Sequence, residues 1–201
     1  MEELIKNTKL CFLSSNQVKL QEMKLQFATR GIEVACVTYK INEIQCLDME
    51  EIVTDKVKKA FKVLKRPVFV EQTGLYIEDF GGLPGGLTET VWTTLGADKF
   101  CDFFGSRQNT NAKAVTVIGY CDGKTVRLFE QTLDGSISKV PKGKKEFQWD
   151  CVFIPKDESK TIACLREETD YQTLRYHTAM EFLDYLETEQ NLGGNQSERT
   201  D

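Results

Sequence analysis

The sequence lacks the features that mark zinc-binding and nucleic-acid-binding proteins. None of its seven cysteines is separated from the next by two residues, which argues against a zinc knuckle or a thioredoxin-type site. Basic residues are not in excess either. The net charge is -5, and a general nucleic-acid binder needs a basic face, so that class is not expected. A local basic pocket for a small polyphosphate stays compatible with this charge.

Long apolar runs and an export signal are also missing. No run approaches the length that crosses a bilayer, so no membrane span is expected. The first six residues, MEELIK, do not form a basic stretch followed by an apolar one, so export is not expected. In an unexported chain, an odd number of scattered cysteines indicates reduced thiols. We therefore expect a cytoplasmic protein.

The residues that are present suffice for one buried core. Of the 201 residues, 40% are hydrophobic and 28% are charged, as in a globular domain. Apolar runs and alternation predict strands at 9–14, 32–39, 67–70 and 148–154, and a hairpin of 113–120 with 124–132. Helical periodicity predicts helices at 17–30, 48–64 and 173–186. Strands mixed with helices predict an α/β or α+β domain over residues 1–186, followed by a polar, disordered tail over 187–201.

The most informative motif is residues 69–85, FVEQTGLYIEDFGGLPG. It predicts a buried strand, a Thr-Gly turn, a short second strand and a Gly-Gly-x-Pro-Gly loop. The motif resembles the signature of the HAM1/inosine triphosphate pyrophosphatase family, which reads V-E-D-[ST]-G-L and then L-G-G-x-P-G. Where the family has its metal-binding, water-activating Asp, this chain has Gln72.

The resemblance covers residues 9–186 in four ordered blocks. It implies a mixed α/β fold in which a long, bent, mixed sheet is flanked by helices in two lobes around a central nucleotide cleft. It also implies hydrolysis of purine nucleoside triphosphates with deaminated bases, with Mg²⁺ bound alongside the nucleotide. Members of the family commonly form dimers, so a homodimer is implied as well.

One block supplies candidate phosphate ligands at the start of a predicted helix. Ser14, Ser15, Asn16 and Lys19 resemble the family's [TS]-G-N-x-x-K. Backbone N–H groups at a helix N-terminus favour phosphate oxygens, and a Lys adds a point charge. The alternative interpretation is an ordinary helix cap, because Ser and Asn are good N-cap residues.

A second block resembles the family's loop with a metal-binding Glu and the following helix with a phosphate-binding Lys. Glu43 and Lys56 are the matching positions. A carboxylate suits Mg²⁺, which commonly bridges nucleotide phosphates and few protein groups. A solvated loop Glu and a surface helix Lys are the alternatives.

Gln72 changes the chemistry that is expected of the third block, the 69–85 motif. An amide is uncharged and a poor base, so it cannot replace an Asp that holds Mg²⁺ and accepts a proton. The adjacent Glu71 is a second candidate metal ligand, but strand neighbours point to opposite faces, so it is not an easy substitute. Thr73 of the same motif is a candidate nucleotide-binding residue. Glu89 stands near the family's Lys or Arg, where a carboxylate repels a triphosphate.

The fourth block is similar to F-G-[YW]-D-P-x-F and implies recognition of the base and sugar. It contains Phe147, Gln148, Trp149 and Asp150. An aromatic ring offers a stacking face to a purine, and an Asp accepts a hydrogen bond from a base N–H or a ribose hydroxyl. The alternative is an amphipathic strand that buries Trp149 and Phe153.

The closing stretch Tyr176-His177-Thr178 resembles the family's S-H-R. His177 is the only histidine and a candidate nucleotide-binding residue, although a lone His on a helix is usually structural. The Arg with which the family reads the purine 6-oxo group is Thr178 here. Arg175, one helical turn away, is the candidate replacement charge.

Retained binding residues beside altered catalytic ones predict a pseudoenzyme that binds a dITP-like nucleotide. The pattern resembles the HAM1-like sensor subunit of the Kongming antiphage system. That resemblance implies a protein partner, a Sir2-like NADase, which the nucleotide-bound sensor activates. Two alternatives stay open. One is an active pyrophosphatase that uses Glu43 with Glu71 or Glu78, and the other is an interaction protein without a ligand.

Overall fold

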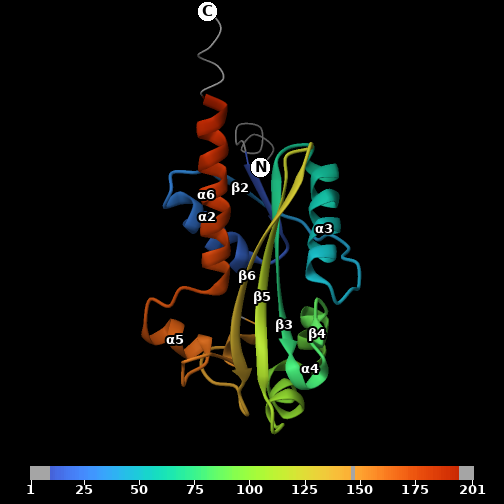
Figure 1. Cartoon of the computed structure of the whole chain (residues 1–201), viewed down its shortest axis with the longest axis vertical. Coiled ribbons are helices and arrows are strands. Elements are labelled where there is room, and N and C mark those ends of the chain that lie inside the picture. Colours follow the sequence, from blue (N-terminus) through green and yellow to red (C-terminus); the bar gives the residue numbers. More distant parts are fainter. Residues whose placement is uncertain (1–9, 146–147, 195–201) are drawn as a thin grey trace, which may run out of the picture.

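The computed structural model describes residues 10–145 and 148–194, which are built around one long, bent, mixed sheet (Figure 1). The strands are β1 (Leu10–Ser14), β2 (Val34–Thr38), β3 (Val68–Ile77), β4 (Pro84–Gly85), β5 (Asn111–Cys121), β6 (Val126–Ile137) and β7 (Phe153–Pro155). Their order is β2-β1-β3-β5-β6-β7, and β4 pairs with β3 away from this path. β1 runs parallel to β2 and β3, while the other pairs are antiparallel. This confirms the predicted mixed sheet.

Helices cover the two faces of the sheet at its upper and lower ends. They are α2 (Gln17–Ala28), α3 (Met49–Leu64), α4 (Thr88–Phe100), α5 (Ile162–Glu168) and α6 (Leu174–Gly194), with short turns η1 (Glu78–Phe80), η2 (Cys101–Gly105) and η3 (Gln148–Cys151). In Figure 1, α2 and α6 lie on one side of the upper sheet and α3 on the other, while α4 and α5 flank the lower half. None of the helices in the described ranges is both long and apolar enough to cross a bilayer.

Three clusters of buried side chains make up the core and follow this division. One lies between the sheet and α3, and a second lies between the sheet and the pair α2 and α6. The third fills the lower half, where β3, β5, α4 and η3 meet. The alternating side chains of β3 belong to both upper clusters, so β3 is the central strand of the molecule.

The sequence predicts a Thr-Gly turn after Val70, and this prediction is wrong. β3 continues through the Thr-Gly pair and is paired with β5 from Val68 to Ile77. A Cβ atom on Gly74 would lie 2.6 Å from the carbonyl oxygen of Gly85, so the glycine is needed for close packing of β4. Gly74 suggests a turn in the sequence, but in the structure it allows the backbone of β4 to lie close beside β3.

Most other predicted helices and strands agree with the structure, and the differences lie mainly in the C-terminal half of the chain. The first strand, the two following helices and the hairpin are confirmed, the hairpin with longer strands. The strand predicted at 148–154 is wrong for its first part, because η3 precedes the short β7. The predicted final helix ends at Leu186, whereas α6 continues to Gly194. Its Glu, Gln and Leu residues favour helix, and this outweighs their polarity. α4 and α5 were not predicted.

Candidate functional site

Two adjoining pockets collect most of the residues that the sequence singles out. The α3-side pocket has a volume of about 700 Å³ and is lined by the β1–α2 turn, residues 39–45, α3, β3 and α4. The α6-side pocket has a volume of only about 70 Å³ and lies between α2, η3, α5 and α6. Asn16, Lys19 and Gln148 line both, so the two pockets lie side by side.

β3 sorts its side chains between the two pockets. Because side chains alternate along a strand, Gln72 faces α3 whereas Glu71 and Thr73 face α2 and α6. All three are buried. The predicted separation of Glu71 from Gln72 is therefore what the structure has, and each residue belongs to a different charged cluster.

The cluster in the α3-side pocket is a closed triangle. Lys56 Nζ lies 2.6 Å from Glu43 Oε1 and donates a hydrogen bond of 2.8 Å to Gln72 Oε1. Gln72 Nε2 donates to Glu43 Oε2 over 3.4 Å. Both ends of the Gln72 amide are thus occupied. The triangle holds one positive and one negative charge, and Glu43 is its only carboxylate.

The cluster on the opposite face of β3 centres on Glu71. Lys19 Nζ lies 2.7 Å from Glu71 Oε2, Arg175 Nε lies 3.3 Å from Oε1, and the Thr73 hydroxyl donates to Oε1. Burial acts to raise the pKa of Glu71, but the two cations outweigh it and hold the pKa at about 2. Glu71 is therefore an ionised group that is paired with two cations, and it does not share a metal position with Glu43.

This cluster continues through two residues that the sequence analysis misses, Glu22 and Arg166. Arg175 Nη1 donates to Glu22 Oε2 over 2.5 Å, and Arg166 bridges Glu22 at 2.6 Å and Asp150 at 3.2 Å. Glu22 follows Lys19 by three residues on α2, so the helical spacing could have placed the two on one face. Arg166 lies in no recognised motif, and nothing in the sequence points to it.

Asp150 is a titratable group in the α6-side pocket. Burial raises the pKa of its carboxyl to about 6, although Arg175 and Arg166 act in the opposite direction. Glu22 adds a smaller raising effect. A carboxyl with this pKa changes its charge, and its hydrogen-bonding role, close to neutral pH.

The β1–α2 turn has the geometry of a helix cap. The Asn16 side-chain oxygen accepts hydrogen bonds from the N–H groups of Val18 and Lys19, at 3.0 and 3.3 Å. Ser14 Oγ accepts from the N–H of Asn16 at 3.1 Å. The N-cap interpretation is confirmed for Asn16. The first turn of α2 carries no acidic residue, so its positive end stays favourable for an anion beside Ser15 in the α3-side pocket.

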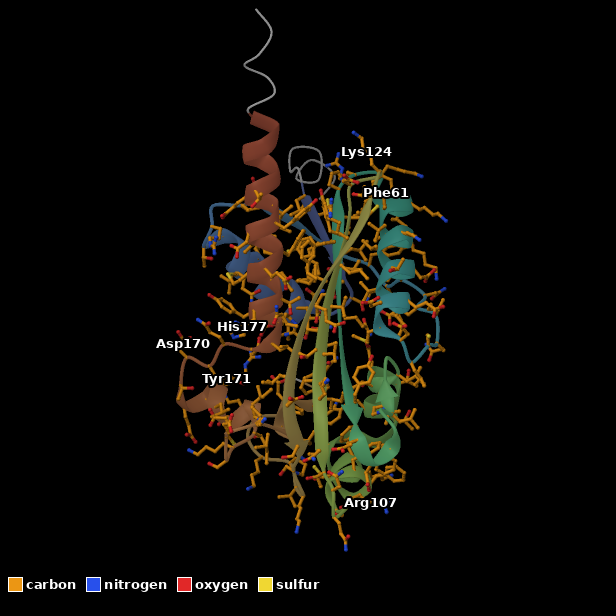
Figure 2. The ribbon with its side chains drawn as sticks, in the orientation of Figure 1. Phe61, Arg107, Lys124, Asp170, Tyr171 and His177 are labelled. Carbon is orange, nitrogen blue, oxygen red and sulfur yellow. The ribbon has the colours of Figure 1, made fainter. Side chains whose placement is uncertain are left out.

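One of the predicted base-recognition residues, His177, is not brought into the pockets. His177 is exposed on α6, where its ring meets the Tyr176 ring edge-on at 5.5 Å (Figure 2). Residues two apart on a helix point about 200° apart, so Arg175 faces the pocket and His177 faces away. Phe147 lies outside the described residues. Trp149 lines the α6-side pocket and also packs edge-on against Phe153 at 5.8 Å, so it is partly a core residue.

The α3-side pocket has few side chains that could act as ligands of a metal ion. Within the described ranges, no three His, Cys, Asp or Glu side chains gather closely enough to hold one. Mg²⁺ on a nucleotide needs only one or two protein carboxylates, because phosphates and water supply its other ligands. Glu43, which lines this pocket, fits that mode of binding.

The sequence of this chain matches the profile of a known protein family. A sequence profile described as the Ham1 family matches residues 10–185, which include the whole sheet and both pockets. The chain belongs to the Ham1 family. This confirms the family resemblance seen in the motifs, and with it the mixed α/β fold.

Named relatives of this Ham1 chain are pyrophosphatases. The dITP/XTP pyrophosphatase of Methanopyrus kandleri is 34% identical over 162 residues, covering 80% of this chain and 86% of the relative. The inosine triphosphate pyrophosphatase of Schizosaccharomyces pombe is 32% identical over 185 residues, covering 90% and 97%. The structure of a HAM1 protein from Coxiella burnetii has a TM-score of 0.75 at 22% identity, covering 90% of this chain and 99% of that one. At that identity, the structural match shows the fold alone.

Proposed function

We propose that this chain binds a purine nucleoside triphosphate across the two pockets and hydrolyses it weakly or not at all. The observation that carries this proposal is Gln72, a neutral amide held between Lys56 and Glu43 where the family motif has an Asp. General-base catalysis needs a group that accepts a proton from the attacking water. A Gln amide is not such a group.

The volumes and charges of the pockets support one orientation of the nucleotide. The phosphates fit the roomier α3-side pocket, where Lys19, Lys56 and the start of α2 provide positive potential. The base fits the α6-side pocket beside Trp149 and Asp150. Since that pocket holds about 70 Å³, a purine can enter only if the pocket widens.

Magnesium has a defined place in this proposal. When bound with the nucleotide, Mg²⁺ neutralises phosphate charge, and Glu43 is the carboxylate that would hold it. Lys56 then exchanges its ion pair with Glu43 for one with a phosphate oxygen, which keeps every charge in the triangle paired. Gln72 can donate a hydrogen bond to a phosphate or a water molecule, but it leaves the proton of that water in place.

We further propose that the chain acts as a sensor of a dITP-like nucleotide and activates a partner effector in antiphage defence, such as a Sir2-like NADase. A protein that binds without hydrolysis does not consume its ligand, so its occupancy follows the concentration of the ligand. A ligand activates an effector only if it favours one state of the complex over another. Bridges from α5 and α6 to α2, made by Arg166 and Arg175 to Glu22, are contacts that ligand entry would change.

An active pyrophosphatase is the second candidate. It is favoured by the two relatives named as pyrophosphatases at 34% and 32% identity. On this reading Glu43 would hold Mg²⁺, which would supply Lewis-acid polarisation of the phosphates, and the proton of the attacking water would pass to solvent without help from residue 72. Such an enzyme would release a nucleoside monophosphate and pyrophosphate continuously, and Glu43→Ala would abolish that release.

One titration separates these functions. The protein is titrated with dITP and Mg²⁺, with dATP as the control nucleotide, and the bound nucleotide is then recovered and identified. Intact dITP near one equivalent per chain supports the sensor, whereas recovery of the monophosphate supports the enzyme. If neither dITP nor dATP raises the melting temperature, the chain is an interaction protein without this ligand and both proposals fail.

A further inference from the structure

One edge of the sheet is unpaired next to a large groove. β6 is paired with β5 over its length from Val126 to Ser136, but its pairing with β7 covers only Gly135 to Ile137. Within the described ranges no other strand adjoins β6. An open strand edge presents a row of unpaired N–H and C=O groups, which is a template for an added strand.

The hydrogen bonds at the β7 end show which backbone groups face the open side. Ser138 donates its N–H to Val152, and the carbonyl of Asp134 accepts from Lys156, each over 2.8 Å. Backbone groups alternate between the two sides of an antiparallel strand. The N–H and C=O groups of the preceding even-numbered residues, such as Thr132, therefore point to the unpaired side.

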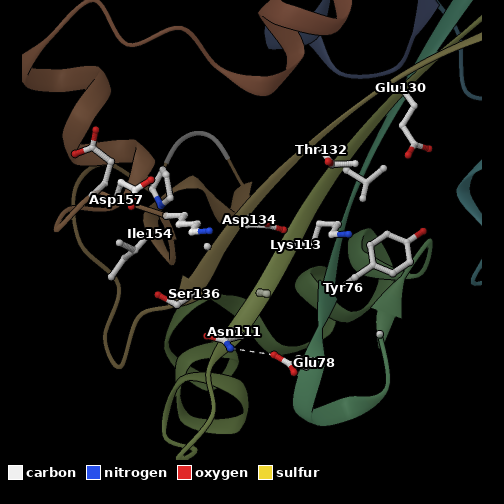
Figure 3. Close-up of a pocket in the computed structure, with 17 residues that line it drawn as sticks. Tyr76, Glu78, Asn111, Lys113, Glu130, Thr132, Asp134, Ser136, Ile154 and Asp157 are labelled. Carbon is white, nitrogen blue, oxygen red and sulfur yellow. Dashed lines mark hydrogen bonds between the residues drawn. The ribbon is translucent and has the colours of Figure 1, made fainter.

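The adjoining groove is wide and predominantly acidic. It has a volume of about 920 Å³ and lies on the face of the sheet formed by β3, β5 and β6, beside β7 (Figure 3). Its acidic residues are Glu78, Glu130, Asp134, Asp157 and Glu158, and its basic ones are Lys113 and Lys156. Its lining also includes Tyr76, Ile154 and Pro155. Figure 3 shows Glu130, Thr132 and Asp134 following one another along β6.

The negative charge of this groove is poorly compensated. The ion pairs found among the described residues involve none of its five acidic side chains. Glu78 accepts a hydrogen bond of 2.9 Å from Asn111, which is neutral. Burial raises the pKa of Glu130, and the neighbouring Glu50 raises it further against the effect of Lys113. A cationic ligand would relieve this repulsion.

We propose that this groove binds an extended, lysine- or arginine-rich segment of a partner protein, which adds as a strand to the open edge of β6. Main-chain hydrogen bonds to residues around Thr132 supply the pairing, and alternate basic side chains meet Glu130 and Asp134. A second copy of this chain is a poor occupant, because two acidic grooves repel each other and the chain as a whole carries a net charge of -5.

The test uses the full chain and synthetic peptides in a fluorescence anisotropy titration. The probe is a labelled peptide of alternating Lys and Val, and the control peptide alternates Glu and Val. A third peptide has the probe's sequence with N-methyl groups on alternate amides, so it keeps the charge but cannot pair as a strand. We expect the probe to bind, the acidic peptide not to bind, and N-methylation to weaken binding by roughly tenfold, since several main-chain hydrogen bonds are lost.

A pair of double variants locates the surface. Glu130→Gln with Asp134→Asn should weaken binding of the probe by roughly fivefold to tenfold, because two surface ion pairs are lost. Glu33→Gln with Asp102→Asn removes equal charge from exposed positions outside the groove, and should leave binding unchanged. Equal weakening by both double variants, full binding of the N-methylated peptide, or no binding of the probe would each overturn the proposal. A shift in oligomeric state of the groove variant alone, measured by sedimentation without peptide, would show that a second copy occupies this face and would also overturn it.

Discussion

At the scale of single residues, the identity of one side-chain group decides which chemistry the α3-side pocket can perform. Gln72 Oε1 lies 2.8 Å from Lys56 Nζ, an ordinary hydrogen-bond distance. The ammonium group of Lys56 therefore faces a neutral oxygen at this position. The proposed function predicts that a change of residue 72 alone alters hydrolysis and leaves binding in place.

The first prediction concerns Gln72→Asp. If the chain is a binder that lacks its base, this variant should raise the rate of pyrophosphate release from dITP by at least about 100-fold, the usual contribution of a general base. Gln72→Asn keeps the amide at the shorter length and should stay as inactive as the unmodified chain. Steady turnover by the unmodified chain, unchanged in Gln72→Asp, would contradict the prediction.

The second prediction concerns Glu71→Gln. This change leaves Lys19 and Arg175 buried without their shared anion, so the free energy of unfolding should fall by about 3–5 kcal/mol. Urea unfolding at neutral pH measures the loss. Glu33→Gln, an exposed change of the same chemistry, should shift the value by less than about 0.5 kcal/mol. A similar small shift for both variants would mean that the buried pairs do not stabilise the fold.

At the scale of elements, β3 positions both clusters because it is one continuous strand. Its pairing with β5 runs over the whole element, from Val68 to Ile77. Glu71 and Gln72 are therefore held on opposite faces by the strand pleat, and neither can replace the other by a change of rotamer.

The third prediction tests the close packing of β4 beside this strand. In Gly74→Ala, the new Cβ lies 2.6 Å from the Gly85 carbonyl oxygen, a backbone atom that cannot move without shifting β4. We expect a loss of about 1–3 kcal/mol in the free energy of unfolding. Lys113→Ala on the neighbouring β5 is exposed and should change it little. Unaltered stability of Gly74→Ala would show that the 84–85 segment is free to move away.

Elements with clear periodicity could be predicted from the sequence, and elements set by tertiary contacts could not. The helix that begins after Asp48 has an apolar stripe and an N-cap, and both signals are local. Gly74 has the opposite character, because its local meaning is a turn and only the position of Gly85 makes it a strand residue. The turn η3 was predicted as a strand for the same reason. Trp149 is buried there by the third core cluster, which is a tertiary contact, and not by strand pairing.

The candidate site shows a similar division. Asn16, Lys19, Glu43 and Lys56 could be predicted because motif order fixes them, and all line the α3-side pocket. Whether His177 or Arg175 points into the α6-side pocket depends on which face of α6 meets that pocket. A three-residue motif does not determine the rotation of the helix.

At the scale of the whole molecule, two buried carboxyls with large pKa shifts, those of Glu71 and Asp150, predict how stability depends on pH. Glu71 has a folded pKa of about 2 against an ordinary 4.5, so its contribution is present above pH 4.5 and is lost as the pH falls toward 2. Asp150 has a folded pKa of about 6 against an ordinary 3.8, so its protonated form stabilises the fold below pH 3.8. That contribution is lost as the pH rises to 6.

The fourth prediction follows from these signs. Urea unfolding across a pH series should show that the free energy of unfolding of the unmodified chain, relative to that of Asp150→Asn, falls by about 2 kcal/mol from pH 4 to pH 6. Arg166, Arg175 and Glu22 face this carboxyl, so the slope belongs to the whole α6-side cluster. A constant difference between the two chains over that range would contradict the prediction.

Gln72 also has a consequence at the level of the gene. Every glutamine codon differs from a glutamate codon by a single base, whereas aspartate codons lie a further substitution away. Glutamate has the same length as glutamine, so its carboxylate would take the place of the Gln72 amide beside Lys56. A single base change could thus return an acid to this position, so this chain is one point mutation away from carrying a carboxylate where the family motif has one.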